Sequence, residues 1–188
     1  MGEAIGSPDP DVFVKATADS FWVMRAIGYP PLLPGGLGVS CGEHTGILYS
    51  PKSLDTREML TGLDYGCTTF LLADDTTNAL QVLSKTGEWL TANPIPHAFV
   101  VNIGDMIEVW TNGLWKSTVH RVIHTGAQYR VSVPFFLEPG FETFVEPLEC
   151  CIERSGGASR YEGVVYGEHL VGKVSGNFYG GGGSGAGI

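Results

Sequence analysis

Charged residues are few in this chain, and basic ones are the scarcest. Lys and Arg number 11 against 20 Asp and Glu, so the formal net charge is -9 at pH 7. No cluster of Lys or Arg offsets this balance, which argues against a nucleic-acid partner. No run approaches the roughly 20 consecutive apolar residues of a membrane-spanning helix, and the acidic first residues lack a signal-peptide core. We therefore expect a soluble cytoplasmic monomer with no membrane partner.

Cysteine is also scarce, and no two cysteines form a Cys-x-x-Cys pair. The four are Cys41, Cys67, Cys150 and Cys151. Adjacent cysteines such as Cys150 and Cys151 are poor candidates for a disulfide. We expect buried or free thiols in a reducing compartment.

Glycine and proline, in contrast, are abundant and separate short apolar runs. There are 27 Gly and 11 Pro in 188 residues, and 43% of the chain is hydrophobic. Strands are expected at 21–27, 38–44, 68–72, 80–83, 89–90, 99–103, 106–110, 119–123 and 129–136, after a short helix from Asp11. Asn112-Gly113 is a hairpin signal, 155–159 a linker, 161–174 a short amphipathic piece and 180–188 a Gly-rich disordered tail. Regularly spaced short strands predict one domain with a sandwich or barrel fold.

Two histidines on predicted strands are candidates for metal ligands. His44 lies near the end of one strand and His120 at the start of another. Two histidines and a carboxylate form the facial triad of non-haem iron(II) oxygenases, which leaves three metal positions open. A lone histidine is more often structural, and we give His97 and His124 that interpretation.

An ordered set of short motifs resembles the isopenicillin N synthase-like family of Fe(II)/2-oxoglutarate-dependent oxygenases. The matching segments are Tyr29-Pro30-Pro31, Gly42-Glu43-His44-Thr45, Asp64-Tyr65-Gly66, Ala98 to Asp105, Trp110 to Gly113, Ser117 to Val122 and Arg130-Val131-Ser132. Each is weak alone, but together they cover roughly residues 21–147. The resemblance implies a mainly β fold, a double-stranded β-helix (distorted jelly-roll barrel) with short flanking helices.

The resemblance also implies roles for individual residues. His44, Asp64 and His120 would hold Fe(II), while Arg130, Ser132 and Tyr29 would bind the cosubstrate 2-oxoglutarate, with O2 as the oxidant. A guanidinium can pair with a carboxylate through two parallel hydrogen bonds, and residues two apart on a strand face the same way. The asparagine that usually stands two positions before the tyrosine is replaced by Ile27.

The iron motif departs from the family pattern. A family member would read His-Thr-Asp-Tyr-Gly without a gap, whereas residues 46–63 separate Thr45 from Asp64 here. Three alternatives follow: Asp64 still reaches the iron across this insertion, since loop closure entropy grows slowly with length; Gly46 takes its position, as in halogenases; or iron binding is lost.

We thus expect a dioxygenase that oxidises a small-molecule substrate by hydroxylation, desaturation or ring closure. Residues 1–20 would be a remnant of the family's N-terminal region, 21–147 the catalytic domain and 148–188 a C-terminal extension. The rival interpretation is a truncated, catalytically impaired isoform that acts as a non-catalytic β-barrel module.

Overall fold

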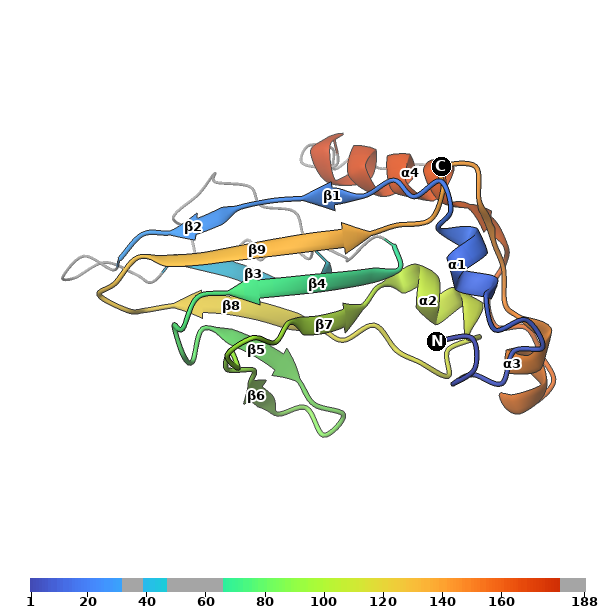
Figure 1. Ribbon diagram of the computed structural model, residues 1–188, viewed down its shortest axis with the longest axis horizontal. Coiled ribbons are helices and arrows are strands. Elements are labelled where there is room, and N and C mark those ends of the chain that lie inside the picture. The colour runs from blue at the N-terminus through green and yellow to red at the C-terminus, as the bar shows by residue number, and fades with distance from the viewer. Residues whose placement is uncertain (32–38, 47–65, 180–188) are drawn as a thin grey trace, which may run out of the picture.

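Two antiparallel sheets form most of the protein (Figure 1). The structure is a computed structural model that describes residues 1–31, 39–46 and 66–179, with side chains for 1–31 and 66–173. The larger sheet has the order β1-β9-β4-β7, with β2 also paired to β9, and the smaller sheet has the order β3-β8-β5-β6. The strands are β1 Val23–Met24, β2 Ile27–Tyr29, β3 Val39–Gly46, β4 Thr68–Ala73, β5 Leu80–Leu83, β6 Trp89–Thr91, β7 Val100–Ile103, β8 His120–His124 and β9 Arg130–Leu137.

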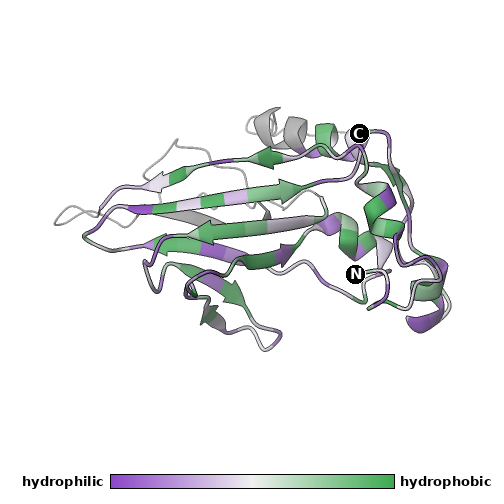
Figure 2. Cartoon of the chain, viewed as in Figure 1, coloured by the Kyte–Doolittle hydropathy of each residue, from purple (hydrophilic) through white to green (hydrophobic). Residues whose placement is uncertain are grey.

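Alternation along β9 shows how the sequence fixes the inner face of the larger sheet. Arg130, Ser132, Pro134 and Phe136 are buried, and the residues between them are half-buried or exposed. Side chains on a strand alternate between faces with a period of two, and Figure 2 shows polar and apolar residues alternating along β9. The inner face of this strand therefore carries its apolar core residues and also two polar ones.

Helices gather at one end of the sheets (Figure 1). They are α1 Val12–Ala16, α2 Asp105–Trp110, α3 Glu149–Arg154 and α4 Tyr166–Tyr179, and a small sheet joins β10 Phe144–Val145 to β11 Val164–Val165. One apolar core unites them, formed by Ile5, Phe13, Cys67, Met106, Ile107, Trp110, Val145, Cys151 and Tyr166. Residues from both ends of the chain thus pack around α2.

The expected mainly β architecture is confirmed, with two corrections. Residues 106–110, predicted as a strand, lie in α2. Asn112 and Gly113 both have positive φ, and the Gly113 N–H donates to the Glu108 carbonyl at 2.8 Å, so this pair ends a helix and does not turn a hairpin. The strand expected at 21–27 is instead divided into β1 and β2, and β2 continues through Gly28 to Tyr29.

The described cysteines and the amphipathic piece also agree with the sequence. Cys67, Cys150 and Cys151 are free thiols. The amphipathic piece at 161–174 contains β11 and the first nine residues of α4, from Tyr166 to Val174. In the described part of the chain, none of the helices combines the length and apolar character that a membrane crossing requires. The predicted insertion at 46–63, apart from Gly46 at the end of β3, and the tail at 180–188 lie outside the described residues.

Candidate active site

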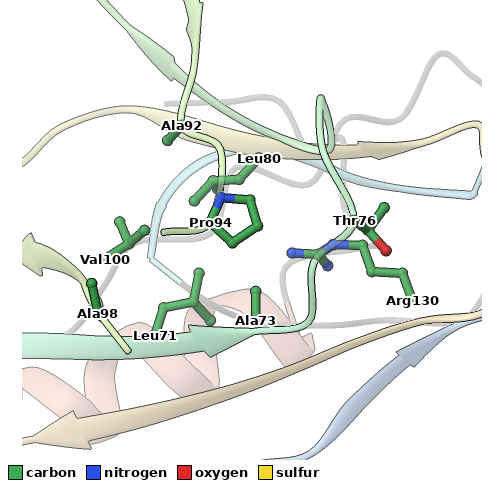
Figure 3. Close-up of a pocket in the computed structure, with 9 residues that line it drawn as sticks. All are labelled: Leu71, Ala73, Thr76, Leu80, Ala92, Pro94, Ala98, Val100 and Arg130. Atoms are coloured by element: carbon green, nitrogen blue, oxygen red, sulfur yellow. The ribbon is translucent and has the colours of Figure 1, made fainter. Parts of the chain in front are cut away.

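A pocket opens between the two sheets (Figure 3). Its walls come from both sheets and from the segment that joins β6 to β7: Leu71, Ala73, Thr76, Leu80, Ala92, Pro94, Ala98, Val100 and Arg130. Among these described residues Arg130 alone is charged, and its guanidinium extends past Thr76 into the pocket. The pocket is therefore an apolar space with a single cation in its wall.

The Arg130 side chain is almost completely buried, with 1% of its surface exposed. Its guanidinium carbon lies 4.7 Å from the centroid of the Tyr29 ring, a favourable cation–π contact. Its Nε and Nη1 atoms have no hydrogen-bond partner among the described residues. A buried donor without a partner costs about 1–3 kcal/mol, and more when it is charged. An anion entering the pocket would satisfy both groups.

Backbone pairing places the other two predicted cosubstrate residues beside Arg130. In the register of β2 with β9, Tyr29 is opposite Arg130 and Ile27 is opposite Ser132. Tyr29 and Ser132 are each 3% exposed. Ser132 follows Arg130 by two residues on the same buried face of β9. The structure thus brings Tyr29, Arg130 and Ser132 together, and their binding of 2-oxoglutarate stays a prediction.

Asp74 secures the start of β9 next to this arginine. Its carboxylate accepts hydrogen bonds from the backbone N–H groups of Val131 and Thr76. Burial raises the pKa of Asp74, but these hydrogen bonds and the nearby Arg130 charge together hold it below its ordinary value. Asp74 thus fixes the backbone beside Arg130.

The two histidine positions of the predicted iron site lie on neighbouring strands. β3 pairs with β8, and the backbone of His44 is directly opposite that of His120, after a bulge between Cys41 and His44. The Nδ1 atom of His120 lies 3.0 Å from the Thr118 carbonyl oxygen. A ring that donates from Nδ1 carries its lone pair on Nε2, which is the tautomer of a metal ligand.

The third predicted ligand, Asp64, lies outside the described residues, as does the side chain of His44. Among the side chains that the structure does describe, no three His, Cys, Asp or Glu residues cluster as a metal site. The complete His44, Asp64 and His120 set therefore stays a prediction, with its two histidine backbones adjacent.

Two other histidines, His124 and His97, are not among the predicted iron ligands. His124 is 1% exposed, its Nε2 lies 2.8 Å from the Gln128 carbonyl oxygen, and its ring packs edge-on against Tyr29. His97 is exposed in a turn and has a positive φ of 63°. Both observations agree with the interpretation made from the sequence.

Sequence reasoning missed a polar cluster behind the site. Asp105 is the first residue of α2, and its Oδ1 accepts the Gly66 N–H at 2.9 Å. Its Oδ2 lies 2.7 Å from Nε2 of His169 in α4. The Gly104-Asp105 pair is visible in the sequence, but nothing in a single chain indicates that His169, 64 residues later, contacts it.

Comparison with known proteins now decides the family. The model of the 2OG-Fe(II) oxygenase superfamily matches residues 41–139, a span that holds the smaller sheet, the pocket and Arg130. The chain belongs to this superfamily. The resemblance drawn from the short motifs is therefore confirmed.

Relatives and solved structures agree with this family. Homoarginine-6-hydroxylase 2-ODD-233 of Oryza sativa subsp. japonica is 47% identical over 180 residues, which are 93% of this chain and 49% of that protein. A homoarginine-6-hydroxylase of Glycine max is 44% identical over 181 residues, with 93% and 49% covered. The chain thus spans about half the length of the curated relatives that it matches.

The fold also agrees with crystal structures that contain the cosubstrate. A full-length Neurospora crassa protein in complex with alpha-KG superposes with a TM-score of 0.72 at 27% identity, covering 93% of this chain and 50% of that one. JOX2 in complex with 2OG, Fe and JA has a TM-score of 0.69 at 29% identity, with 90% and 45% covered. The double-stranded β-helix predicted from the sequence is therefore confirmed.

Proposed function

We propose that this chain is the catalytic half of an Fe(II)- and 2-oxoglutarate-dependent oxygenase that oxidises a small organic substrate. One observation carries the proposal: the buried Arg130 guanidinium has two donor groups without a partner among the described residues, and it lines an apolar pocket. A carboxylate that accepts two hydrogen bonds is the natural counterpart of these donors. The arrangement fits one carboxylate of 2-oxoglutarate.

The residues divide into two groups by what they would bind. Arg130 would pair with the distal carboxylate of the cosubstrate, Ser132 would add a hydroxyl from the same face of β9, and Tyr29 would close the site beside them. His44, Asp64 and His120 would bind iron. Iron held there would supply, with O2, the oxidative chemistry that links oxidation of the substrate to decarboxylation of 2-oxoglutarate to succinate and CO2.

For the substrate we propose homoarginine or a similar basic amino acid, and hydroxylation as the reaction. The support is the name shared by four plant relatives that are 40–47% identical to this chain over 87–93% of its length. More distant relatives carry other names, such as thebaine 6-O-demethylase at 29% identity. The degree of identity favours the first group.

Succinate release in air tests this proposal. The purified chain, supplied with Fe(II) and 2-oxoglutarate, is incubated with homoarginine, arginine, lysine or no substrate, and an Arg130→Ala variant is the matched control. We expect succinate release that homoarginine stimulates and that the variant lacks. A chain that binds Fe(II) but responds to none of these amino acids would contradict the substrate, and one that binds no Fe(II) would favour the non-catalytic module.

A further inference from the structure

Helix α2 lies between the two segments that lead to the predicted iron ligands. One segment contains Gly66, which follows Asp64 by two residues. The other contains Ser117, which precedes His120 by three residues. Each of these residues donates its backbone N–H to a carboxylate of α2. Gly66 donates to Asp105 at 2.9 Å, and Ser117 donates to Glu108 at 2.9 Å.

Gly66 is held by more than the Asp105 side chain. Its carbonyl accepts the Met106 N–H at 2.9 Å, and the next residue, Cys67, accepts the Gly104 N–H at 2.8 Å. Gly66 has a φ of +141°, and a Cβ atom at this position would collide with the Glu138 carboxylate. Only glycine therefore fits, and three hydrogen bonds fix the chain where it enters β4.

Both carboxylates of α2 are in turn held by the C-terminal segment. His169 of α4 lies 2.7 Å from Asp105 Oδ2, and both side chains are about four-fifths buried, with 19% and 20% of their surfaces exposed. The Tyr161 hydroxyl donates to Glu108 Oε1 at 2.8 Å, and Lys116 donates to the same oxygen at 2.9 Å. Each carboxylate thus has one partner in the segment that it holds and another in residues 161–169.

We infer that the C-terminal segment positions the iron ligands through α2: His169 orients Asp105, which fixes Gly66, and Tyr161 orients Glu108, which fixes Ser117. This inference rests on the proposed function, since it assigns Asp64 and His120 to iron. His169 and Tyr161 are positioning residues, because neither acts on the substrate. Partners that bond directly to metal ligands typically change metal affinity by about 10–100-fold when removed. We expect His169 and Tyr161, which act through a carboxylate and a backbone amide, to lie at the lower end.

The test compares four variants of the full 188-residue chain by anaerobic Fe(II) titration in the presence of 2-oxoglutarate. His169→Leu removes the partner of Asp105, and Tyr161→Phe removes a single oxygen atom. His169→Gln keeps a side-chain N–H donor and should rescue. Ser155→Ala is the matched control, because Ser155 accepts from Asn112 at the end of α2 at 2.6 Å but contacts neither ligand segment.

We expect His169→Leu and Tyr161→Phe each to weaken Fe(II) binding by about tenfold, and His169→Gln and Ser155→Ala to change it little. Amide hydrogen exchange of Gly66 should accelerate in His169→Leu and that of Ser117 in Tyr161→Phe. Should His169→Leu fail to fold, Tyr161→Phe decides the matter. A wild-type chain that binds Fe(II) together with variants of equal affinity would overturn this inference alone. A wild-type chain that binds no Fe(II) would overturn the proposed function and this inference with it.

Discussion

The helical end of the molecule and the space between its two sheets bury different kinds of residue. At the helical end, Trp110 packs edge-on against Phe13 at 5.4 Å, and Met106 and Ile107 are buried around it. Between the sheets lies Arg130, the largest of the fully buried side chains that the structure describes, a cation whose Nε and Nη1 have no partner among the described residues. Burial of apolar surface in the first region stabilises the fold, whereas burial of a charge in the second destabilises it.

This difference indicates that the helical end stabilises the fold and that the region between the sheets binds the ligand. An unsatisfied buried charge lowers the free energy of unfolding of the empty protein, and a bound anion restores it. The helical end can supply that stability because it needs no opening for substrate. Substitutions at the helical end should therefore alter the free energy of unfolding, and substitutions between the sheets should alter cosubstrate affinity.

Trp110→Ala should have the largest effect. Removing a buried tryptophan from a packed core costs about 3–5 kcal/mol of unfolding free energy. Trp89→Ala is the control, since Trp89 is half-buried on the smaller sheet against Arg121 and should cost less. Urea unfolding measures both. An equal decrease in the free energy of unfolding for the two variants would show that the helical end does not contribute most of the stability.

Arg130→Lys should lower 2-oxoglutarate affinity by about tenfold to a hundredfold, with little change in unfolding. An ammonium group cannot form the two parallel hydrogen bonds of a guanidinium, and a charged hydrogen bond contributes about 1.5–3 kcal/mol. Arg121→Lys is the matched control, because Arg121 faces Trp89 and Gln81 on the smaller sheet. Calorimetry that found the same affinity for both variants would refute the role of Arg130.

Deleting residues 46–63 should raise Fe(II) affinity by up to roughly a hundredfold. The deletion joins Thr45 to Asp64 and restores His-Thr-Asp, in which His44 and Asp64 are two residues apart on one strand end. Closing the chain across 18 additional residues to bring them together would cost on the order of 2–3 kcal/mol in closure entropy. Anaerobic titration of both forms measures the change, and equal affinities would mean that the insertion does not hinder the site.

Glu108→Gln should have the smallest effect, and it should depend on pH. Burial raises the pKa of Glu108, but hydrogen bonds from Lys116, Ser117 and Tyr161 together hold it below its ordinary value of 4.5. The carboxylate therefore stabilises the fold above about pH 4.5, and this contribution is lost as the pH falls through the lowered pKa. Urea unfolding at several pH values should show a wild-type advantage on the order of 1 kcal/mol or less at pH 7 that shrinks in acid. An advantage that grew in acid would contradict this sign.

The strands and the shared face of Arg130 and Ser132 could be predicted from the sequence because both depend on local pattern. Short runs bounded by glycine and proline gave β4, β5, β7, β8 and β9 within one or two residues. The spacing of Arg130 and Ser132 placed them on one face of a strand, which the alternating burial of β9 confirms.

The helix α2 and the contacts behind it could not be predicted because they depend on tertiary structure. Met106 to Trp110 is a short apolar run that suits a strand or a helix equally, and packing against Phe13 and Val145 decides between them. The contact of Asp105 with His169 joins residues 64 positions apart. Such a contact leaves no periodic signal in either segment.

Calorimetric titration of the wild-type chain with Fe(II), under anaerobic conditions and with 2-oxoglutarate present, tests the central claim most directly. His120→Ala serves as the control, since it removes the one predicted metal ligand whose side chain the structure describes. We expect saturable binding of one Fe(II) per chain that requires His120 and tightens when 2-oxoglutarate is added. Absence of binding, or equal binding by the wild type and His120→Ala, would contradict it.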